Sequence, residues 1–192
     1  AGCKVMGIDL DPERVEFGNQ NGISTVLREN AVSQSQTFTK NKGFDSVFIC
    51  ADTQSNDPVD LAGIISRDRG VVVALGAVGL EIPRKNYYEK EISFLISRSY
   101  GPGRYDNNYE ENGNDYPYGY VRWTEGRNLG AVVSLLEDEK INVKPLITHR
   151  FPIEEGVKAY EIITGKYKIP FMGVVITYNP LETKDINLIK NR

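Results

Sequence analysis

The chain has 192 residues, of which 40% are hydrophobic and 26% are charged, with a formal net charge of -3. This length suits one domain with a sizeable core, and the small charge excludes strong attraction to nucleic acid or an anionic membrane. No apolar run reaches the roughly 18 residues of a membrane span. The two cysteines, Cys3 and Cys50, are expected to be buried free thiols in a reducing compartment, which predicts a cytoplasmic protein. Because His149 is the only histidine, we expect no metal site within the chain.

Short apolar runs alternate with helical patterns along the chain. Strands are expected at residues 4–9, 25–27, 46–50, 71–75, 92–97 and 171–178. Helices are expected at residues 12–19, 31–40, 58–67, 129–138 and 153–164. Pro12 and Pro58 each follow an aspartate, which suits a helix that begins at an N-cap. The runs SVFIC and VVVAL are apolar on both strand faces, as in parallel strands that helices cover on both sides. The pattern predicts an α/β, three-layer fold with a mostly parallel sheet.

Residues 100–127 break this alternation. They hold six of the 11 tyrosines and the only tryptophan. A loop of this length is usually functional or disordered, and its aromatic content favours an ordered loop. Its arginines, set among aromatic residues, suit anion or sugar binding or an interdomain contact. A surface loop that packs on its own tyrosines is the alternative. The candidate residues are Arg98, Arg104, Tyr105, Arg122 and Trp123. The polar residues 179–192 are interpreted as a tail or linker.

Asp9 ends the first apolar run, and Arg14 lies five residues further on. A carboxylate at the end of the second strand of a dinucleotide-binding fold accepts hydrogen bonds from ribose hydroxyls and repels a 2′-phosphate, so Asp9 favours NAD over NADP. The alternative for Asp9 is a helix N-cap, and the alternative for Arg14 is a solvated helix charge.

Small residues follow two further strands, in FICADTQS and in VVVALGAVG. Ligands of open α/β sheets lie beyond the carboxyl ends of the strands, where small residues let a flat ring approach the backbone. A tight turn is the alternative for Gly76 and Gly79. No nucleophile, base and acid set is apparent, and a structural role is expected for His149.

Four consecutive blocks resemble the zinc-type medium-chain alcohol dehydrogenases: AGCKVMGIDLDPERVEF, GFDSVFICA, VVVALGAVG and VKPLITHRFPIEEGVKAYEII. The resemblance implies a Rossmann-like, C-terminal cofactor-binding domain over residues 1–178, truncated so that its first strand and glycine loop precede the chain. Any catalytic zinc would lie in an upstream domain. A basic residue that contacts the cofactor phosphate in some members would fall near Gly173 and is absent. The implied NAD contacts are Asp9 and Arg14 at the adenosine ribose, Cys50 and Ala51 beside the adenine and ribose, and Leu75, Gly76 and Ala77 on the nicotinamide side.

The segment SRSYGPGRYDNNYEENGNDYPYGYVRWTE is similar to a loop of bi-domain bacterial oxidoreductases of polysaccharide biosynthesis. That resemblance implies a fused C-terminal oxidoreductase domain in a longer parent protein. The parent is expected to transfer a hydride between NAD and an alcohol or sugar carbinol, and the chain alone is expected to be inactive. A homodimer is expected through residues 92–97, by analogy with the family. The alternative function is a non-catalytic binding or assembly module.

Overall fold

The computed structural model describes residues 2–179, which divide into two compact units, residues 2–128 and 129–179. None of the helices in residues 2–179 combines the length and the apolar character that crossing a membrane would require. The single domain expected over residues 1–178 stays a prediction, and the expected tail lies outside the described residues from residue 180 onward.

The first unit begins with a strand, a helix and a second strand: β1 (Met6–Asp9), α1 (Pro12–Gln20) and β2 (Ser24–Leu27). The two strands are parallel, with Asp9 beside Leu27. The N-cap of α1 is Asp11, whose Oδ1 accepts a hydrogen bond from the backbone N–H of Glu13 at 2.9 Å. Pro12 then fills the first helical position, where its missing N–H costs nothing. The predicted helix start is confirmed.

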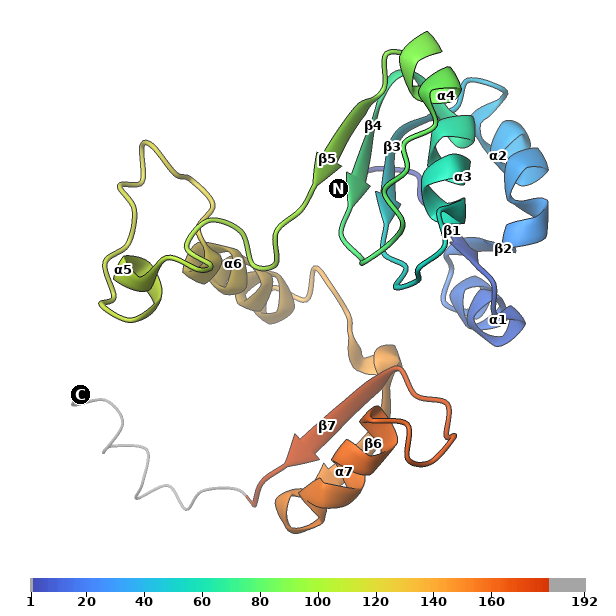
Figure 1. Cartoon of the computed structure of the whole chain (residues 1–192). Helices are drawn as coiled ribbons and strands as arrows, with labels where there is room; N and C mark the ends of the chain where they lie inside the picture. The colour runs from blue at the N-terminus through green and yellow to red at the C-terminus, as the bar shows by residue number, and fades with distance from the viewer. Residues whose placement is uncertain (1, 180–192) are drawn as a thin grey trace. The chain divides into compact units, whose positions relative to one another are not determined.

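A second parallel sheet has the order β3–β4–β5 (Figure 1). Its strands are β3 (Phe44–Ile49), β4 (Ser66–Ala74) and β5 (Ser93–Ile96), and its connections contain η1 (Arg28–Asn30), α2 (Ala31–Thr39), α3 (Asp57–Ile65) and α4 (Arg84–Glu89). β4 begins five residues before the predicted strand because α3 already ends at Ile65 and Ser66 is extended. The six-residue α4 was not predicted, since so short a helix shows no clear hydrophobic period.

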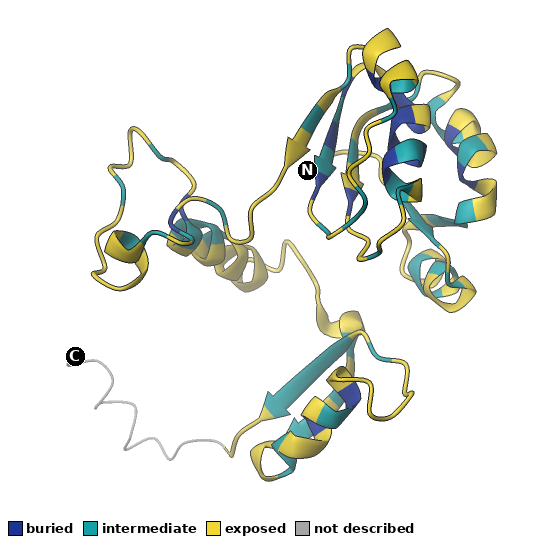
Figure 2. Cartoon of the chain, viewed as in Figure 1, coloured by how far each residue is buried: buried dark blue, intermediate teal, exposed yellow. Residues whose placement is uncertain are grey.

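Two apolar clusters form the core of the first unit. One joins β3 and β4 to α3 and α4 through Ile49, Val59, Ala62, Val72 and Tyr87. The other consists of Ala31, Leu61 and Ile65, and it receives side chains from both sheets, Ile8 of β1 and Phe44 and Val47 of β3. Figure 2 shows the buried residues gathered along α3 and the strands beside it. The two sheets therefore rest on the same helices, although no strand pairing joins β1 to β3 among the described residues.

Two burial expectations were wrong. The run SVFIC was expected to be buried on both faces, but Phe48 of β3 is 63% exposed. Alternate residues of a strand face opposite sides. Within the first unit, α3 and α4 cover the side of the sheet that carries Val72, so β3 is not buried on both faces. Cys3 and Cys50 are free but exposed, because Cys3 precedes β1 and Cys50 follows β3, so neither lies within a strand.

Residues 98–128, which include the loop expected at residues 100–127, belong to the first unit. This segment contains the short helix α5 (Asn107–Glu110), and the ring of Tyr109 stacks on that of Tyr116 at 5.7 Å between centroids. The hydroxyl of Tyr109 accepts a hydrogen bond from Gly126 N at 2.8 Å. The segment thus packs on its own tyrosines, although other aromatic side chains remain exposed.

Helix α6 (Glu125–Glu137) crosses the boundary at residue 128, and the second unit continues with two parallel strands and a helix. Ala159 and Ile162 are the buried residues of that helix, α7. His149 lies in β6 with its ring stacked on Phe151 at 6.3 Å, which agrees with the expected structural role. The elements after α6 are η2 (Lys144–Leu146), β6 (Ile147–Pro152), η3 (Ile153–Glu155), α7 (Gly156–Ile163) and β7 (Gly173–Thr177).

The buried phenol of Tyr87 predicts a loss of stability at high pH. Tyr87 is 6% exposed and donates a hydrogen bond to Val59 O at 2.9 Å. Burial raises the pKa of this phenol to about 12, and the nearby carboxylate of Asp60 adds to the rise. The folded state keeps the proton that an unfolded tyrosine releases near pH ~10, so the free energy of unfolding should fall between about pH 10 and about pH 12, by up to ~2.7 kcal/mol.

Urea unfolding across this pH range measures the effect. Tyr87→Phe should flatten the decline, because phenylalanine has no proton to lose. The control is Tyr88→Phe, which changes a neighbouring ring that is 67% exposed and should leave the decline as it is. An unchanged pH profile in Tyr87→Phe would contradict the prediction.

Candidate functional site

The carboxyl ends of β2 and β3 meet through one ion pair. Arg28 follows β2, and its Nε and Nη2 donate to Oδ2 and Oδ1 of Asp57 at 2.7 and 2.5 Å. Asp57 begins α3, which follows β3, and its carboxylate raises the pKa of the Arg28 guanidinium. Because β1 runs parallel to β2, the end of β1 lies at this same edge. The edge is where ligands of open α/β sheets bind.

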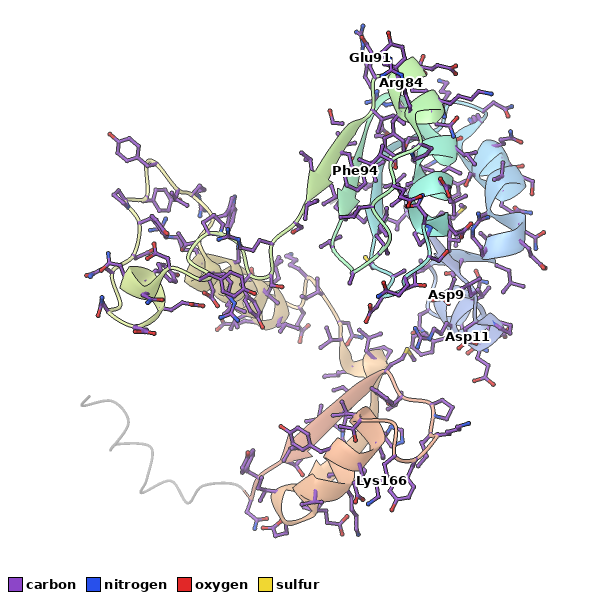
Figure 3. All side chains as sticks on the ribbon, in the orientation of Figure 1. Asp9, Asp11, Arg84, Glu91, Phe94 and Lys166 are labelled. Atoms are coloured by element: carbon purple, nitrogen blue, oxygen red, sulfur yellow. The ribbon has the colours of Figure 1, made fainter. Side chains whose placement is uncertain are left out.

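Asp9 stands at this edge, and its carboxylate is not a helix cap. Its Oδ1 accepts a hydrogen bond from the backbone N–H of Asp11 at 3.0 Å, while the cap of α1 is Asp11 itself. Figure 3 shows both aspartates at the junction of β1 and α1. Within residues 2–179, Oδ2 of Asp9 has no hydrogen-bond partner. One carboxylate oxygen is therefore held in place and the other can accept a bond from a ligand.

Arg14 lies on the exposed side of α1. Its side chain is 62% exposed, and its Nε lies 3.6 Å from Oδ2 of Asp11. This position matches the solvated helix charge that was the alternative, and such an exposed pair contributes little to stability. A ribose contact by Arg14 stays a prediction.

The loops that follow β3 and β4 are joined by backbone hydrogen bonds. The N–H groups of Leu75 and Gly76 both donate to Ile49 O, at 2.9 and 3.0 Å. Further along, Thr53 N donates to Ala77 O at 2.8 Å. The structure therefore brings together five residues that the sequence placed at the cofactor: Cys50, Ala51, Leu75, Gly76 and Ala77.

Gly76 is required by close approach of the two loops. A Cβ at this position would lie 1.9 Å from Ala51 O, and the backbone of Gly76 is not left-handed. Gly79 is less confined, since its Cβ would lie 3.1 Å from Asn56 N. The tight-turn alternative for Gly76 is thus replaced by a packing requirement, which also keeps this edge free of a side chain.

Asn56 holds the segment after β4 by two hydrogen bonds, a role that the sequence did not predict. Its Nδ2 donates to Glu81 O at 2.8 Å, and its Oδ1 accepts from Glu81 N at 2.9 Å. Asn56 also holds the N-cap position of α3, which the Asp-Pro pattern had assigned to Asp57. An asparagine directly before an Asp-Pro pair was the available signal, but its partner lies 25 residues away.

The second unit explains the glycine at position 173. A Cβ on Gly173 would lie 2.7 Å from Leu146 O, at the start of the β6–β7 pairing. A basic side chain cannot occupy this position without shifting that backbone. Packing against Leu146 thus explains why a glycine stands here, where some family members are expected to carry a basic residue.

The candidate residues of segment 98–128 fall into two groups. Arg104 pairs with Glu110 at 2.6 Å and lies over the ring of Tyr105 at 4.5 Å, and Arg98 donates to Arg104 O at 2.9 Å. Arg122 lies over Trp123 at 4.0 Å.

No group of three metal-ligating side chains occurs among residues 2–179. Two grooves lie near the amino end of β4, around Arg69 and Lys90. The candidate site at the carboxyl edge consists of loop backbone and one oriented carboxylate.

The sequence profile of the zinc-binding dehydrogenase family matches residues 1–112. Sorbitol dehydrogenase of Homo sapiens is 23% identical over 164 residues, which is 83% of this chain and 39% of that protein. The protein of the same name from Gallus gallus is 55% identical over 31 residues, covering 16% of this chain and 9% of that protein. The chain spans well under half the length of these curated relatives.

Two solved structures share the fold. Alcohol dehydrogenase TADH from Thermus sp. ATN1 aligns with a TM-score of 0.66 at 21% identity, over 92% of this chain and 44% of that one. The 2R,3R-butanediol dehydrogenase from Bacillus subtilis aligns with a TM-score of 0.65 at 18% identity, over 93% and 45% of the two chains. These alignments support the Rossmann-like α/β class.

Gly76→Ala should destabilise the first unit. The added methyl group would meet Ala51 O, so we expect a loss of about 1–3 kcal/mol in the free energy of unfolding. Gly119→Ala is the control, because a Cβ there meets nothing within 4 Å. Urea unfolding of both variants makes the comparison, and equal stability of the two would show that the loops can separate at no cost.

Proposed function

Because the chain belongs to the zinc-binding dehydrogenase family, we propose that its first unit is part of the NAD-binding domain of an oxidoreductase. One observation carries this proposal: Asp9 ends β1 with one carboxylate oxygen fixed by Asp11 N and the other unengaged in residues 2–179. A carboxylate so placed suits a ribose diol and disfavours a 2′-phosphate. The proposal therefore specifies NAD rather than NADP.

The neighbouring residues suit the rest of the dinucleotide. The hydrogen-bonded loops after β3 and β4 present small residues and backbone along which a flat ring can lie. We assign Cys50 and Ala51 to the wall beside adenine and ribose, and Arg14 to the ribose. The nicotinamide side is assigned to Leu75, Gly76 and Ala77.

The pyrophosphate site needs a further element. The sequence holds no Gly-x-Gly-x-x-Gly turn, whose N–H groups usually bind the pyrophosphate at a helix N-terminus. Among the described strands, β1 and β3 each have one unpaired edge while they pack against the same helices. We place between them the strand and glycine loop that the family resemblance implies. The chain alone should accordingly bind NAD weakly and lack dehydrogenase activity.

The reaction proposed for the longer protein is hydride transfer between NAD and an alcohol or sugar carbinol. The nicotinamide supplies the hydride chemistry, and the protein supplies position and electrostatics. The support for this reaction class is that the relatives are named sorbitol, alcohol and butanediol dehydrogenase. The same proposal includes a zinc site upstream, a fused C-terminal oxidoreductase domain, a role in polysaccharide biosynthesis and a cytoplasmic location.

Asp9→Ser tests the assignment in the full-length protein. Loss of a charged hydrogen-bond acceptor costs roughly 1.5–3 kcal/mol, so NAD should bind about 10- to 100-fold more weakly while NADP changes less. The matched control is Glu16→Gln, which removes an exposed carboxylate on α1 that bonds only to Gln20 in residues 2–179. Calorimetric titration with both dinucleotides gives the ratio. Equal binding of NAD and NADP by the unmodified protein would show that Asp9 does not select the cofactor.

We also propose that the edge of β5 forms a homodimer contact. β5 pairs only with β4 among the described strands, and Ile96 is 70% exposed. An unpaired apolar edge is a template for strand pairing with a second copy. Ile96→Lys should shift a dimer toward monomer in light scattering, whereas Val157→Lys, at a 74% exposed position of α7, should not. Monomers in the unmodified protein would remove the proposal.

A further inference from the structure

Four side chains of segment 98–128 form a ladder of arginines and aromatic rings. The guanidinium of Arg122 lies over the ring of Trp123 at 4.0 Å and over that of Tyr118 at 4.7 Å. The guanidinium of Arg127 lies over Tyr118 at 5.0 Å. Contacts of this kind orient the flat face of an arginine and leave its N–H edge available.

One end of the ladder is fixed by hydrogen bonds. Nη2 of Arg127 donates to Oδ2 of Asp115 and to Tyr116 O, both at 2.6 Å, and Nη1 donates to Val121 O. Arg127 is therefore held by three hydrogen bonds to the segment itself. Its fixed position supports the ring of Tyr118, on which Arg122 rests.

Arg122 differs from the other arginines of the segment. It is exposed, and within residues 2–179 it forms neither a hydrogen bond nor an ion pair. Arg104 is paired with Glu110, and Arg98 donates to Arg104 O. The stacking on two rings thus presents a charged N–H edge that nothing in the described residues satisfies.

Three of the five acidic side chains of segment 98–128 already have partners. Asp115 pairs with Arg127, and Glu110 pairs with Arg104. Asp106 accepts hydrogen bonds from the hydroxyl of Tyr116 and from Asn108 N, which lower the pKa of its carboxyl. Arg122 thus has no carboxylate partner among the described residues, and its N–H edge can receive an oxyanion from outside.

The rings around Arg122 add an apolar surface. Tyr120 is 91% exposed, Tyr118 is 58% exposed and Trp123 is 49% exposed. The negative face of an aromatic ring attracts polarised C–H groups, which line the flat side of a sugar ring. A planar guanidinium edge binds a carboxylate or phosphate with two parallel hydrogen bonds.

We propose that Arg122, Tyr118 and Trp123 form a binding site for a sugar that carries a carboxylate or a phosphate. The sugar ring lies against an aromatic face, and the oxyanion takes the N–H edge of Arg122. The inference goes beyond dinucleotide binding and concerns a different part of the chain.

Trp123 makes the test direct, because it is the only tryptophan of the chain. Its fluorescence is followed while the full chain is titrated, without dinucleotide and at constant ionic strength, with glucuronate, glucose 6-phosphate, glucose or inorganic phosphate. A saturable change with one of the two anionic sugars, at least about tenfold tighter than with glucose or inorganic phosphate, supports the site. The anionic sugar that binds more tightly shows whether the oxyanion is a carboxylate or a phosphate.

Variants connect the signal to Arg122. Arg122→Met should weaken binding about tenfold or more, and Arg122→Lys should restore only part of it, because an ammonium cannot form the bidentate pair. Arg150→Met removes an exposed arginine of β6 and serves as the control. Circular dichroism establishes that each variant is folded. Equal affinity for glucose, equal affinity for inorganic phosphate, or full affinity in Arg122→Met would overturn the proposal, and none of these results depends on NAD binding.

Discussion

The arrangement of the first unit depends on a layer of helices that two sheets share. Among the described strands, no pairing joins β1 to β3, so hydrogen bonds of the ladder cannot fix one sheet against the other. The connection is instead the apolar cluster of Ala31, Leu61 and Ile65, which receives Ile8 from one sheet and Phe44 and Val47 from the other. Burial of apolar surface is non-directional. Directional contacts must therefore set the relation of the strand ends, and the bidentate bond of Arg28 to Asp57 is the one that crosses between the sheets at their carboxyl edge.

The candidate site follows from this arrangement, because it consists of strand ends and the loops after them. Hydrogen bonds from Leu75 and Gly76 to Ile49 O bring two loops so close that position 76 has no room for a side chain. Asn56 holds the next part of the chain by two bonds to the backbone of Glu81. These hydrogen bonds hold the two loops together beside the carboxylate of Asp9, whose Oδ2 has no partner among the described residues. Such an edge suits a long ligand with a ribose at one point, which agrees with a dinucleotide.

Segment 98–128 is stabilised by a different kind of contact. It has little apolar core, so it is stabilised by arginine contacts and by tyrosine hydroxyls bound to backbone and carboxylate groups. Thr124, which is fully buried, and the stacked rings of Tyr109 and Tyr116 form its small interior. The arginines are not equivalent within this network: Arg127 forms three hydrogen bonds, whereas Arg122 forms none among the described residues.

The sequence by itself determined the α/β class, the start of α1 at Asp11 and Pro12, and the position of Asp9 at the end of a strand, because periodicity, capping and strand ends are local properties. It also identified the small residues after β3 and β4. It did not determine that Asp57 pairs with Arg28 and does not cap α3, why Gly76 must be glycine, or that Phe48 and the two cysteines are exposed. Those outcomes depend on groups distant along the chain, such as Ala51 for Gly76 and Arg28 for Asp57. Only the tertiary structure decided them, since packing and long-range hydrogen bonds form only where folding brings such groups together.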